Sequence, residues 1–266
     1  MKIKTIDFSK FSSFKIGPKI DVSVLEDEKD FLPLTKNDYE LIGSCNNLLI
    51  SDNPPPLYML SKKYDYIKIE DNFLKIGAAT PSGKIASFCK KNNIANFEFV
   101  SHLPGTLGGL VFMNAGLKEY EIFNNLVQIT TDKELVKKED IEYGYRYTNI
   151  SDIILEASFS ISYGFDTDKV EMFKKMRSNQ PSTASAGSCF KNPVGDYAGR
   201  LIEEVGLKGV HKGNMCFSNE HANFLVNNGN GKFEDAIYLI EEAQKRVFEK
   251  FGILLECEIG VLDKSL

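Results

Sequence analysis

A glycine-rich stretch constrains the fold of this chain more than any other segment. It covers residues 103–116, and four glycines fall within its last twelve residues. Glycine at this density lets the backbone turn sharply or approach something bulky, such as a pyrophosphate held by N–H groups. The stretch has neither the Gly-x-Gly-x-x-Gly of a Rossmann fold nor the Gly-Lys-Ser/Thr of a P-loop. A glycine-rich turn that only packs fits these residues equally well.

A second informative stretch is Ser185-Ala186-Gly187-Ser188-Cys189-Phe190-Lys191-Asn192-Pro193. Gly187 lets the backbone approach a ligand and present the Ser188 hydroxyl without a bulky neighbour. Lys191 and Asn192 add a cation and an amide, which suits an anionic polar substrate. The alternative is a turn between a helix and a strand, with Ser188 solvated.

Two shorter segments carry weaker signals. The polar turn 43–47 separates two apolar runs and can offer N–H groups to a phosphate, although an ordinary loop has the same composition. Arg146 lies among three tyrosines, where it can stack on a ring or form a forked pair with a carboxylate. An exposed strand arginine is the alternative.

Apolar periodicity predicts a mixture of strands and helices. Asp71-Asn72 predicts a hairpin between two strands, and Gly252 a helix end. Asn53-Pro54-Pro55-Pro56 predicts a rigid connector between subdomains. On the final strand, Glu256 and Glu258 share one face. The predicted strands are 20–25, 66–70, 73–77, 126–131, 142–147, 153–163, 221–227 and 254–259, and the predicted helices are 82–91 with Ser82 as cap, 166–179, a short one ending near 206, and 233–251.

Composition excludes several classes of function. The chain has 266 residues and a net charge of −5, so it has no basic field for nucleic acid or an anionic membrane surface. It has no apolar run of membrane-spanning length and no signal peptide, so we expect a cytoplasmic protein. Its five cysteines are scattered and its three histidines lack ligand spacing, which predicts neither disulfides nor a metal site.

Taken in order, these motifs resemble the UDP-N-acetylenolpyruvoylglucosamine reductase (MurB) family, flavoenzymes of cytoplasmic peptidoglycan precursor synthesis. The resemblance runs from Ser12 to about Leu262. The short interval between Arg146 and Ser188 looks like the type II-like subtype, which lacks an inserted substrate-covering loop. The segments that carry the resemblance are Pro-Gly-Thr-x-Gly-Gly…Met-Asn-Ala-Gly at 104–116, Tyr145-Arg146, Arg177-x-x-Gln-Pro, Ser-Ala-Gly-Ser-x-Phe-Lys-Asn-Pro at 185–193, His221-Ala222-Asn223 and Leu255-Glu256-x-Glu258.

The resemblance implies an α+β fold with two domains. Residues 1–165 would form an FAD-binding domain of the vanillyl-alcohol-oxidase (PCMH) type, in subdomains of about 1–56 and 57–165. Residues 166–266 would form an α/β substrate-binding domain whose last strand brings Glu258 to the active site. We expect a monomer with non-covalent FAD. The flavin-binding residues that the resemblance implies are Gly43, Ser44, Asn46, Asn47, Leu48, Pro104, Gly105, Thr106, Gly108, Gly109, Asn114, Ala115 and Gly116.

The resemblance also implies a reaction. NADPH, the co-substrate, would reduce FAD and leave, and the enolpyruvyl ether of a UDP-sugar would then bind. Hydride would add to its terminal carbon while Arg146 holds the carboxylate on which charge develops. Ser188 would give a proton to the adjacent carbon, and Glu258 would be the active-site carboxylate. The residues expected to contact the sugar nucleotide are Tyr145, Lys191, Asn192 and His221.

Departures from the family pattern leave alternatives open. The loop usually written Gly-Gly-Gly-Ser-Asn is here Gly43 to Asn47 with one glycine, and Ile259-Gly260 replaces Val-Arg. A catalytically silent nucleotide-sugar-binding protein is therefore one alternative. An FAD oxidase with flavin attached to His102 is another. A hydrolase built on Ser188 and His221 is disfavoured, because Ser188 is not within a Gly-x-Ser-x-Gly elbow.

Overall fold

The computed structural model describes residues 1–34 and 39–265. Its contacts divide the chain into two compact units. Unit 1 consists of Met1–Lys4, Val22–Ser44 and Pro56–Ser178, and unit 2 of Thr5–Asp21, Cys45–Pro55 and Asn179–Leu266. The functional domains expected at 1–165 and 166–266 stay a prediction.

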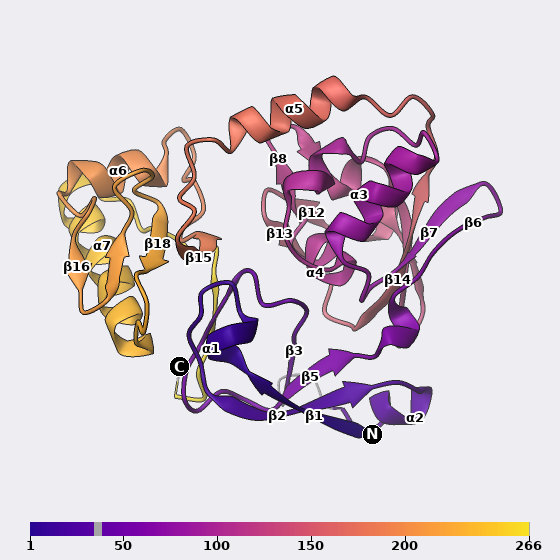
Figure 1. The fold of residues 1–266 in the computed structure, drawn as a ribbon, viewed down its shortest axis with the longest axis horizontal. Coiled ribbons are helices and arrows are strands. Elements are labelled where there is room, and N and C mark those ends of the chain that lie inside the picture. The colour runs from indigo at the N-terminus through magenta and orange to yellow at the C-terminus, as the bar shows by residue number, and fades with distance from the viewer. Residues whose placement is uncertain (35–38, 266) are drawn as a thin grey trace. The chain divides into compact units, whose positions relative to one another are not determined.

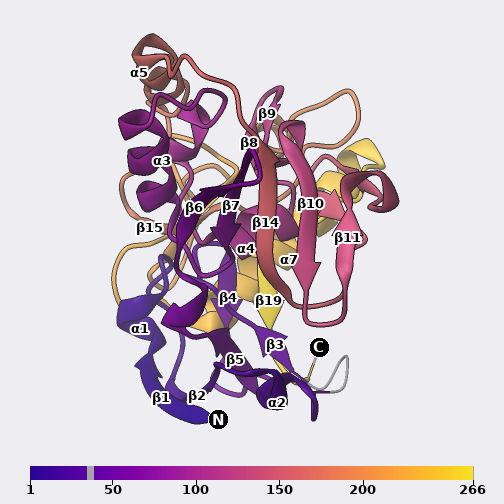
Figure 2. The same ribbon diagram turned by 90° about the vertical axis from the view of Figure 1, so that its right-hand side faces the viewer.

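The main sheet of unit 1 has five antiparallel strands in the order β11-β10-β14-β7-β6 (Figure 2). Its central strand, β14, is buried along most of its length and has a paired neighbour on each side, with irregularities of register in its pairing with β10. The sheet packs with α3 and α4 into one large apolar core. The bounds are β6 Ile67–Glu70, β7 Phe73–Gly77, β10 Leu126–Thr131, β11 Leu135–Lys137, β14 Ile154–Ser160, α3 Ser82–Lys91 and α4 Leu107–Phe112.

The predicted hairpin is confirmed and joins β6 to β7. Asp71 and Asn72 both have positive φ, 53° and 64°, as a two-residue hairpin turn of the primed type requires. Helix α3 also lies where it was predicted. Its N-cap is Pro81, not the expected Ser82, and Ser82 begins the helix instead.

Among the described residues, the other strands and α-helices before β15, apart from α1 and β4, form one further sheet, two strand pairs and two helices. A four-stranded sheet has the order β1-β2-β5-β3, in which β5 pairs in parallel with both of its neighbours. Two antiparallel pairs, β8–β9 and β12–β13, follow later in unit 1. Their bounds, with the helices, are β1 Lys2–Asp7, β2 Lys19–Leu25, β3 Glu40–Leu41, β5 Leu57–Leu60, β8 Gly116–Leu117, β9 Tyr120–Glu121, β12 Tyr143–Gly144, β13 Tyr147–Thr148, α2 Glu28–Phe31 and α5 Thr167–Met176.

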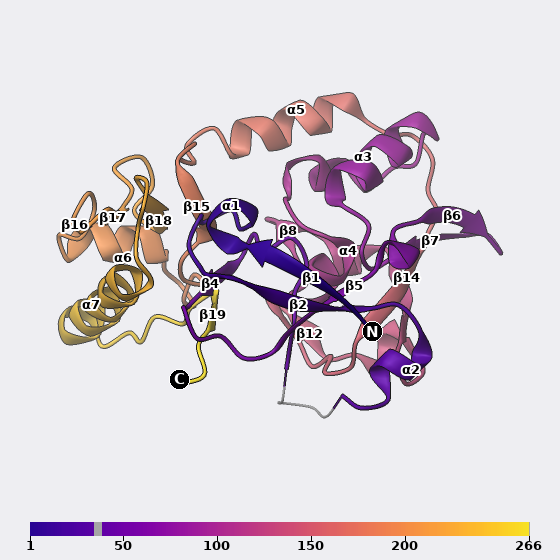
Figure 3. The ribbon, with the colours of Figure 1, turned by 60° about the horizontal axis from the view of Figure 1, so that its bottom comes forward.

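Unit 2 is built on a small antiparallel sheet, β15-β18-β17-β16, with α6 and α7 beside it (Figures 1 and 3). Helix α7 buries a stripe of side chains at helical spacing and ends at Gly252, whose φ is 68°. The parallel pair β4–β19 contributes to the same unit. The bounds are α1 Phe8–Phe11, β4 Leu48–Ile50, β15 Ala184–Ser188, α6 Ala198–Glu204, β16 His211–Lys212, β17 Met215–Phe217, β18 Phe224–Asn227, α7 Phe233–Phe251 and β19 Gly260–Leu262.

Two predicted strands are wrong. Residues 142–147 are not one strand but the hairpin β12–β13, because Arg146 adopts a left-handed backbone with φ of 55° and reverses the chain. Residues 254–259 form only a single bridge at Cys257, and the last strand begins at Gly260. In the described part of the chain, no helix has the length and apolar character that crossing a membrane requires.

Candidate active site

The glycine-rich stretch forms helix α4 of unit 1 and the residues on either side of it. Gly105 has a φ of 135°, which L side chains rarely adopt, and its carbonyl oxygen accepts from the Ser82 amide at 2.9 Å. The first two amides of α4 are already used: Leu107 donates to Thr80 and Gly108 donates to Ala78, both at 2.9 Å. Any anion at this loop would therefore have to take its hydrogen bonds from other groups of the stretch.

The polar turn 43–47 begins at Gly43, which lies next to Thr106 of the glycine-rich stretch. A Cβ placed on Gly43 would lie only 2.5 Å from Thr106 Oγ1, so glycine at this position leaves room for the Thr106 side chain. A Cβ on Gly109, by contrast, would meet no heavy atom within 4 Å. The two segments offer backbone amides and hydroxyls with no carboxylate among residues 43–44 and 104–109. A donor set of this kind, approached through glycine, fits the pyrophosphate of a dinucleotide cofactor.

The end of the glycine-rich stretch is occupied by contacts within the protein. Asn114 is fully buried, and its Nδ2 donates to Glu121 Oε2 at 2.9 Å and to the Gly144 carbonyl oxygen at 3.0 Å. Its Oδ1 accepts from the Phe123 amide at 3.3 Å. Ala115 is buried as well. The Asn114 side chain thus links the stretch to the β12–β13 hairpin.

That hairpin holds the predicted carboxylate-binding arginine at its turn. Arg146 Nη2 donates to the Gly116 carbonyl oxygen at 2.8 Å, and its guanidinium carbon lies 5.0 Å from the centroid of the Tyr145 ring. Thr148 Oγ1 adds a third tie by donating to the Phe112 carbonyl oxygen at 2.6 Å. Residues 112–116 therefore support the turn that carries Arg146.

In unit 2, Ser188 ends strand β15 and the chain carrying Glu258 runs alongside. The Glu258 amide donates to the Cys189 carbonyl oxygen at 2.9 Å, and the Lys191 amide donates to the Glu256 carbonyl oxygen at 2.9 Å. The structure thus places the Ser188 and Glu258 backbones next to each other. Glu256 is largely exposed, whereas Glu258 is half-buried.

The second half of the polar turn 43–47 is bonded to the chain at Glu258 and Gly260. Asn47 Nδ2 donates to the Glu258 carbonyl oxygen at 2.8 Å, and the Gly260 amide donates to the Asn47 carbonyl oxygen at 2.9 Å. Leu48 then pairs in register with Gly260, and the Asn46 carbonyl oxygen accepts from Ser13 Oγ at 3.3 Å. Cys45 within this loop is buried, and burial raises the pKa of its thiol to about 12.

The residues expected to contact substrate have partners of their own. Lys191 Nζ forms an ion pair with Glu256 at 2.5 Å. Asn192 Oδ1 accepts from the first amide of α6, at Ala198, at 3.1 Å. Burial lowers the pKa of His221, whose Nδ1 accepts from the Asn223 amide at 3.3 Å. That bond uses the oxygen of the Asn192 carboxamide, and the nitrogen of the same group is a hydrogen-bond donor suited to a ligand.

His102 is the residue to which flavin would be attached in the alternative of an FAD oxidase. Its Nε2 lies 3.1 Å from the Val170 carbonyl oxygen, within hydrogen-bonding distance.

Asn223 was not among the predicted site residues, although it belongs to the His221-Ala222-Asn223 motif. Its carboxamide bonds to the backbone of Phe190, two residues beyond Ser188.

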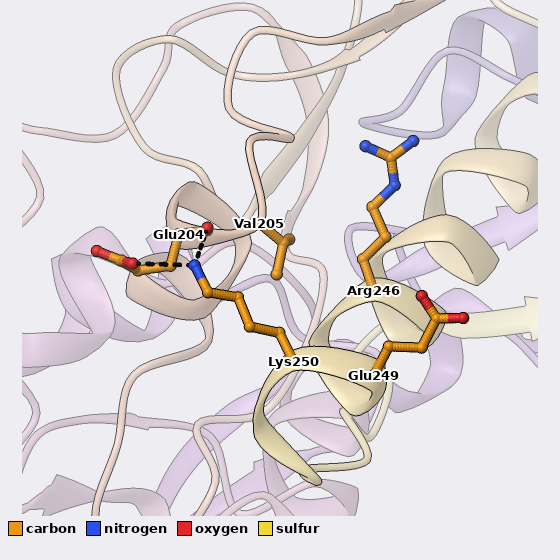
Figure 4. Close-up of a pocket in the computed structure, with 5 residues that line it drawn as sticks. All are labelled: Glu204, Val205, Arg246, Glu249 and Lys250. Atoms are coloured by element: carbon orange, nitrogen blue, oxygen red, sulfur yellow. Dashed lines mark hydrogen bonds and ion pairs between the residues drawn. The ribbon is translucent and has the colours of Figure 1, made fainter.

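Unit 2 also has a hollow on its surface. It is bordered by α6 and the C-terminal half of α7, and Lys250 reaches across it to the Glu204 carboxylate at 3.3 Å (Figure 4). None of the predicted site residues lines it. Its lining residues are Glu204, Val205, Arg246, Glu249 and Lys250.

Comparisons with known proteins identify the class of protein as a reductase. Residues 179–262 match the family model described as the UDP-N-acetylenolpyruvoylglucosamine reductase C-terminal domain. A crystal structure of UDP-N-acetylenolpyruvylglucosamine reductase from Thermus caldophilus superposes with a TM-score of 0.85 at 26% identity, covering 98% of this chain and 99% of that one.

Curated relatives give the family. The chain is 48% identical to the UDP-N-acetylenolpyruvoylglucosamine reductase of Campylobacter jejuni (strain RM1221), covering 97% of this chain and 99% of that protein. It is 45% identical to the reductase of the same name from Helicobacter hepaticus, covering 98% and 100%. The chain belongs to the UDP-N-acetylenolpyruvoylglucosamine reductase family.

Proposed function

We propose that this protein reduces the enolpyruvyl ether of UDP-N-acetylglucosamine to UDP-N-acetylmuramate, a step of peptidoglycan precursor synthesis. The observation that carries the proposal is the 48% identity to a reductase of that name over nearly the full length of both chains. Members of this family depend on FAD and use NADPH. The Gly43–Thr106 contact and the neutral donors around it support cofactor binding here.

The residues take the following roles in this proposal. Residues 1–165 bind FAD in a fold of the vanillyl-alcohol-oxidase type, and residues 166–266 bind the sugar nucleotide. When bound and reduced by NADPH, FAD supplies the hydride that adds to the terminal carbon of the enol ether. Arg146 holds the substrate carboxylate, where negative charge grows as the hydride adds. Its hydrogen bond to Gly116 fixes the guanidinium before the charge develops.

Ser188 then donates a proton to the carbon next to the carboxylate, which completes the reduction. A serine hydroxyl is a weak acid, so its placement has to favour the transfer. Glu258 is the carboxylate of the site, and its backbone bond to Cys189 keeps it next to the Ser188 segment. Asn192, Lys191, Tyr145 and His221 contact the sugar nucleotide.

An anaerobic spectroscopic experiment tests this function. The purified protein should show visible flavin absorption that NADPH bleaches, and addition of the enolpyruvyl UDP-sugar should restore it. Mass spectrometry should then find a product two hydrogens heavier. A colourless protein that FAD cannot reconstitute would contradict the proposal, as would a bleached flavin that molecular oxygen reoxidises and the substrate does not.

A further inference from the structure

Strand β15 changes its path just before Ser188. Ser185 pairs with Val226 and Ser188 pairs with Phe224, so β15 advances three residues while β18 advances two. The extra residue is a β-bulge at Ala186 and Gly187, and Gly187 has a φ of 84°. A bulge re-aims the side chains that follow it, so the direction of the Ser188 hydroxyl depends on what holds the chain immediately beyond.

The Asn223 side chain bonds to the chain just beyond Ser188. Asn223 Oδ1 accepts from the Phe190 amide at 3.0 Å, and Asn223 Nδ2 donates to the Phe190 carbonyl oxygen at 2.8 Å. The Asn223 carbonyl oxygen also accepts from the Cys189 amide at 2.7 Å. A carboxamide carries the same donor and acceptor as a peptide group, so Asn223 continues the β-ladder past the start of β18 at Phe224.

The opposite edge of this segment carries Glu258. The Cys189 carbonyl oxygen accepts from the Glu258 amide at 2.9 Å, and the Glu258 carbonyl oxygen accepts from Asn47 Nδ2 at 2.8 Å. The backbone at Cys189 and Phe190 therefore lies between the Asn223 carboxamide and the Glu258 chain. Because Asn223 is only 3% exposed, water cannot easily replace its bonds.

We propose that Asn223 is a positioning residue for proton donation: through both atoms of its carboxamide it fixes the Cys189–Phe190 backbone, and thereby aims the Ser188 hydroxyl and keeps Glu258 beside it. This inference rests on the proposed function. A displacement of about 1 Å can cost about 10²-fold in rate, so a modest shift of this backbone is sufficient to slow the proton transfer.

The chain provides a matched control at Asn227. This residue is also a buried asparagine, 4% exposed, at the far end of β18. Its Nδ2 donates to the Phe14 carbonyl oxygen at 2.9 Å, and its Oδ1 accepts from the Gly229 and Gly231 amides at 2.9 Å. It thus resembles Asn223 in burial and bonding. Its backbone pairs with Ala184 at the far end of β15, but its side-chain hydrogen bonds given above go to residues other than Cys189 and Phe190.

The test compares Asn223→Ala with Asn227→Ala in stopped-flow kinetics of the two half-reactions. For Asn223→Ala we expect flavin reduction by NADPH within about twofold of wild type and reoxidation by the enolpyruvyl substrate slowed roughly 10- to 100-fold. The solvent deuterium isotope effect on reoxidation should rise, because proton transfer becomes more rate-limiting. Hydrogen exchange of the unliganded protein should speed up at the Cys189 and Phe190 amides. Asn227→Ala should change none of these readouts.

Several results would overturn the inference. These are unchanged reoxidation and isotope effect in a folded Asn223→Ala protein, equal slowing of both half-reactions, or equal slowing by Asn227→Ala. If Asn223→Ala does not fold, Asn223→Ser takes its place, because the hydroxyl can still accept from the Phe190 amide. The wild-type protein separates the two claims: if its flavin is not reoxidised by the enolpyruvyl substrate, the proposed function fails, while faster exchange at Cys189 and Phe190 in Asn223→Ala still reports the positioning role.

Discussion

The Arg146 guanidinium donates from Nη2 to the Gly116 carbonyl oxygen at 2.8 Å. Gly116 in turn is held so closely that a Cβ on it would lie 2.4 Å from the Tyr120 carbonyl oxygen and 2.9 Å from Glu121 Cα. Both obstacles are backbone atoms, which cannot move aside as a flexible side chain would. The arginine proposed to bind the substrate carboxylate is therefore anchored to a position that admits only glycine.

Gly116→Ala should destabilise the protein for this reason. Overpacking of this kind typically costs about 1–3 kcal/mol, and we expect the free energy of unfolding in urea to fall by that amount. Gly83→Ala is the control, because a Cβ on Gly83 in helix α3 meets no heavy atom within 4 Å. It should be neutral or stabilise the protein by up to about 1 kcal/mol. Equal stability of the two variants would show that the backbone at Gly116 can relax.

Arg146→Lys should impair binding of the substrate carboxylate without impairing reduction of the flavin by NADPH. Lysine has one ammonium where arginine has a planar fork, so it cannot both donate to Gly116 and form a bidentate pair with a carboxylate. We expect reoxidation of the reduced enzyme by substrate to slow by about 10²-fold or more, with bleaching by NADPH retained. Arg200→Lys, which alters an exposed arginine paired with Asp196, should leave both steps unchanged. Normal reoxidation by Arg146→Lys would remove the bidentate contact from the mechanism.

Ser188→Ala should stop the reaction after reduction of the flavin. The hydroxyl is the proposed proton source, so its loss should slow reoxidation by the enolpyruvyl substrate by about 10²-fold or more, while NADPH still bleaches the protein. Ser185→Ala is a close control, because Ser185 lies on the same strand and its partner Val226 is two residues from the Ser188 partner Phe224. Stopped-flow absorption gives both rates. Turnover of Ser188→Ala at the wild-type rate would exclude the serine as donor.

Local sequence patterns predicted much of the secondary structure correctly. The Asp71-Asn72 hairpin, helix α3 and helix α7 with its Gly252 end all depend on residues near in sequence, such as turn formers and an apolar stripe. The single strand predicted over 142–147 was wrong because Arg146 takes a left-handed conformation that residue type does not announce. The bonds to Gly116 and Asn114 that accompany this turn come from residues about 30 positions away.

The candidate site shows the same limit. Ser188, Arg146 and Glu258 were named from motifs, and their roles stay predictions that the experiments above address. The Asn223 carboxamide could not be found from residue type, because its importance comes from bonds to Phe190 across 33 positions. Likewise, the strand predicted over 254–259 depended on an apolar run, whereas pairing of Gly260 with Leu48 of β4 decides where the strand begins.

The stability of the protein should depend on pH through His221. Burial lowers the pKa of this imidazole in the folded state and outweighs a backbone hydrogen bond that acts to raise it. Its Nδ1 accepts from the Asn223 amide in the neutral form. In the unfolded chain the imidazole titrates near about pH 6.5, so the unfolded state binds the proton more readily. The contribution of His221 is then fully present above that pH and is lost as the pH falls through about 6.5 towards the lower folded value.

We expect the free energy of unfolding in urea to fall less between about pH 7 and about pH 5 in His221→Gln than in the wild type. An identical pH dependence in His221→Gln and wild type would show that this imidazole titrates alike in both states.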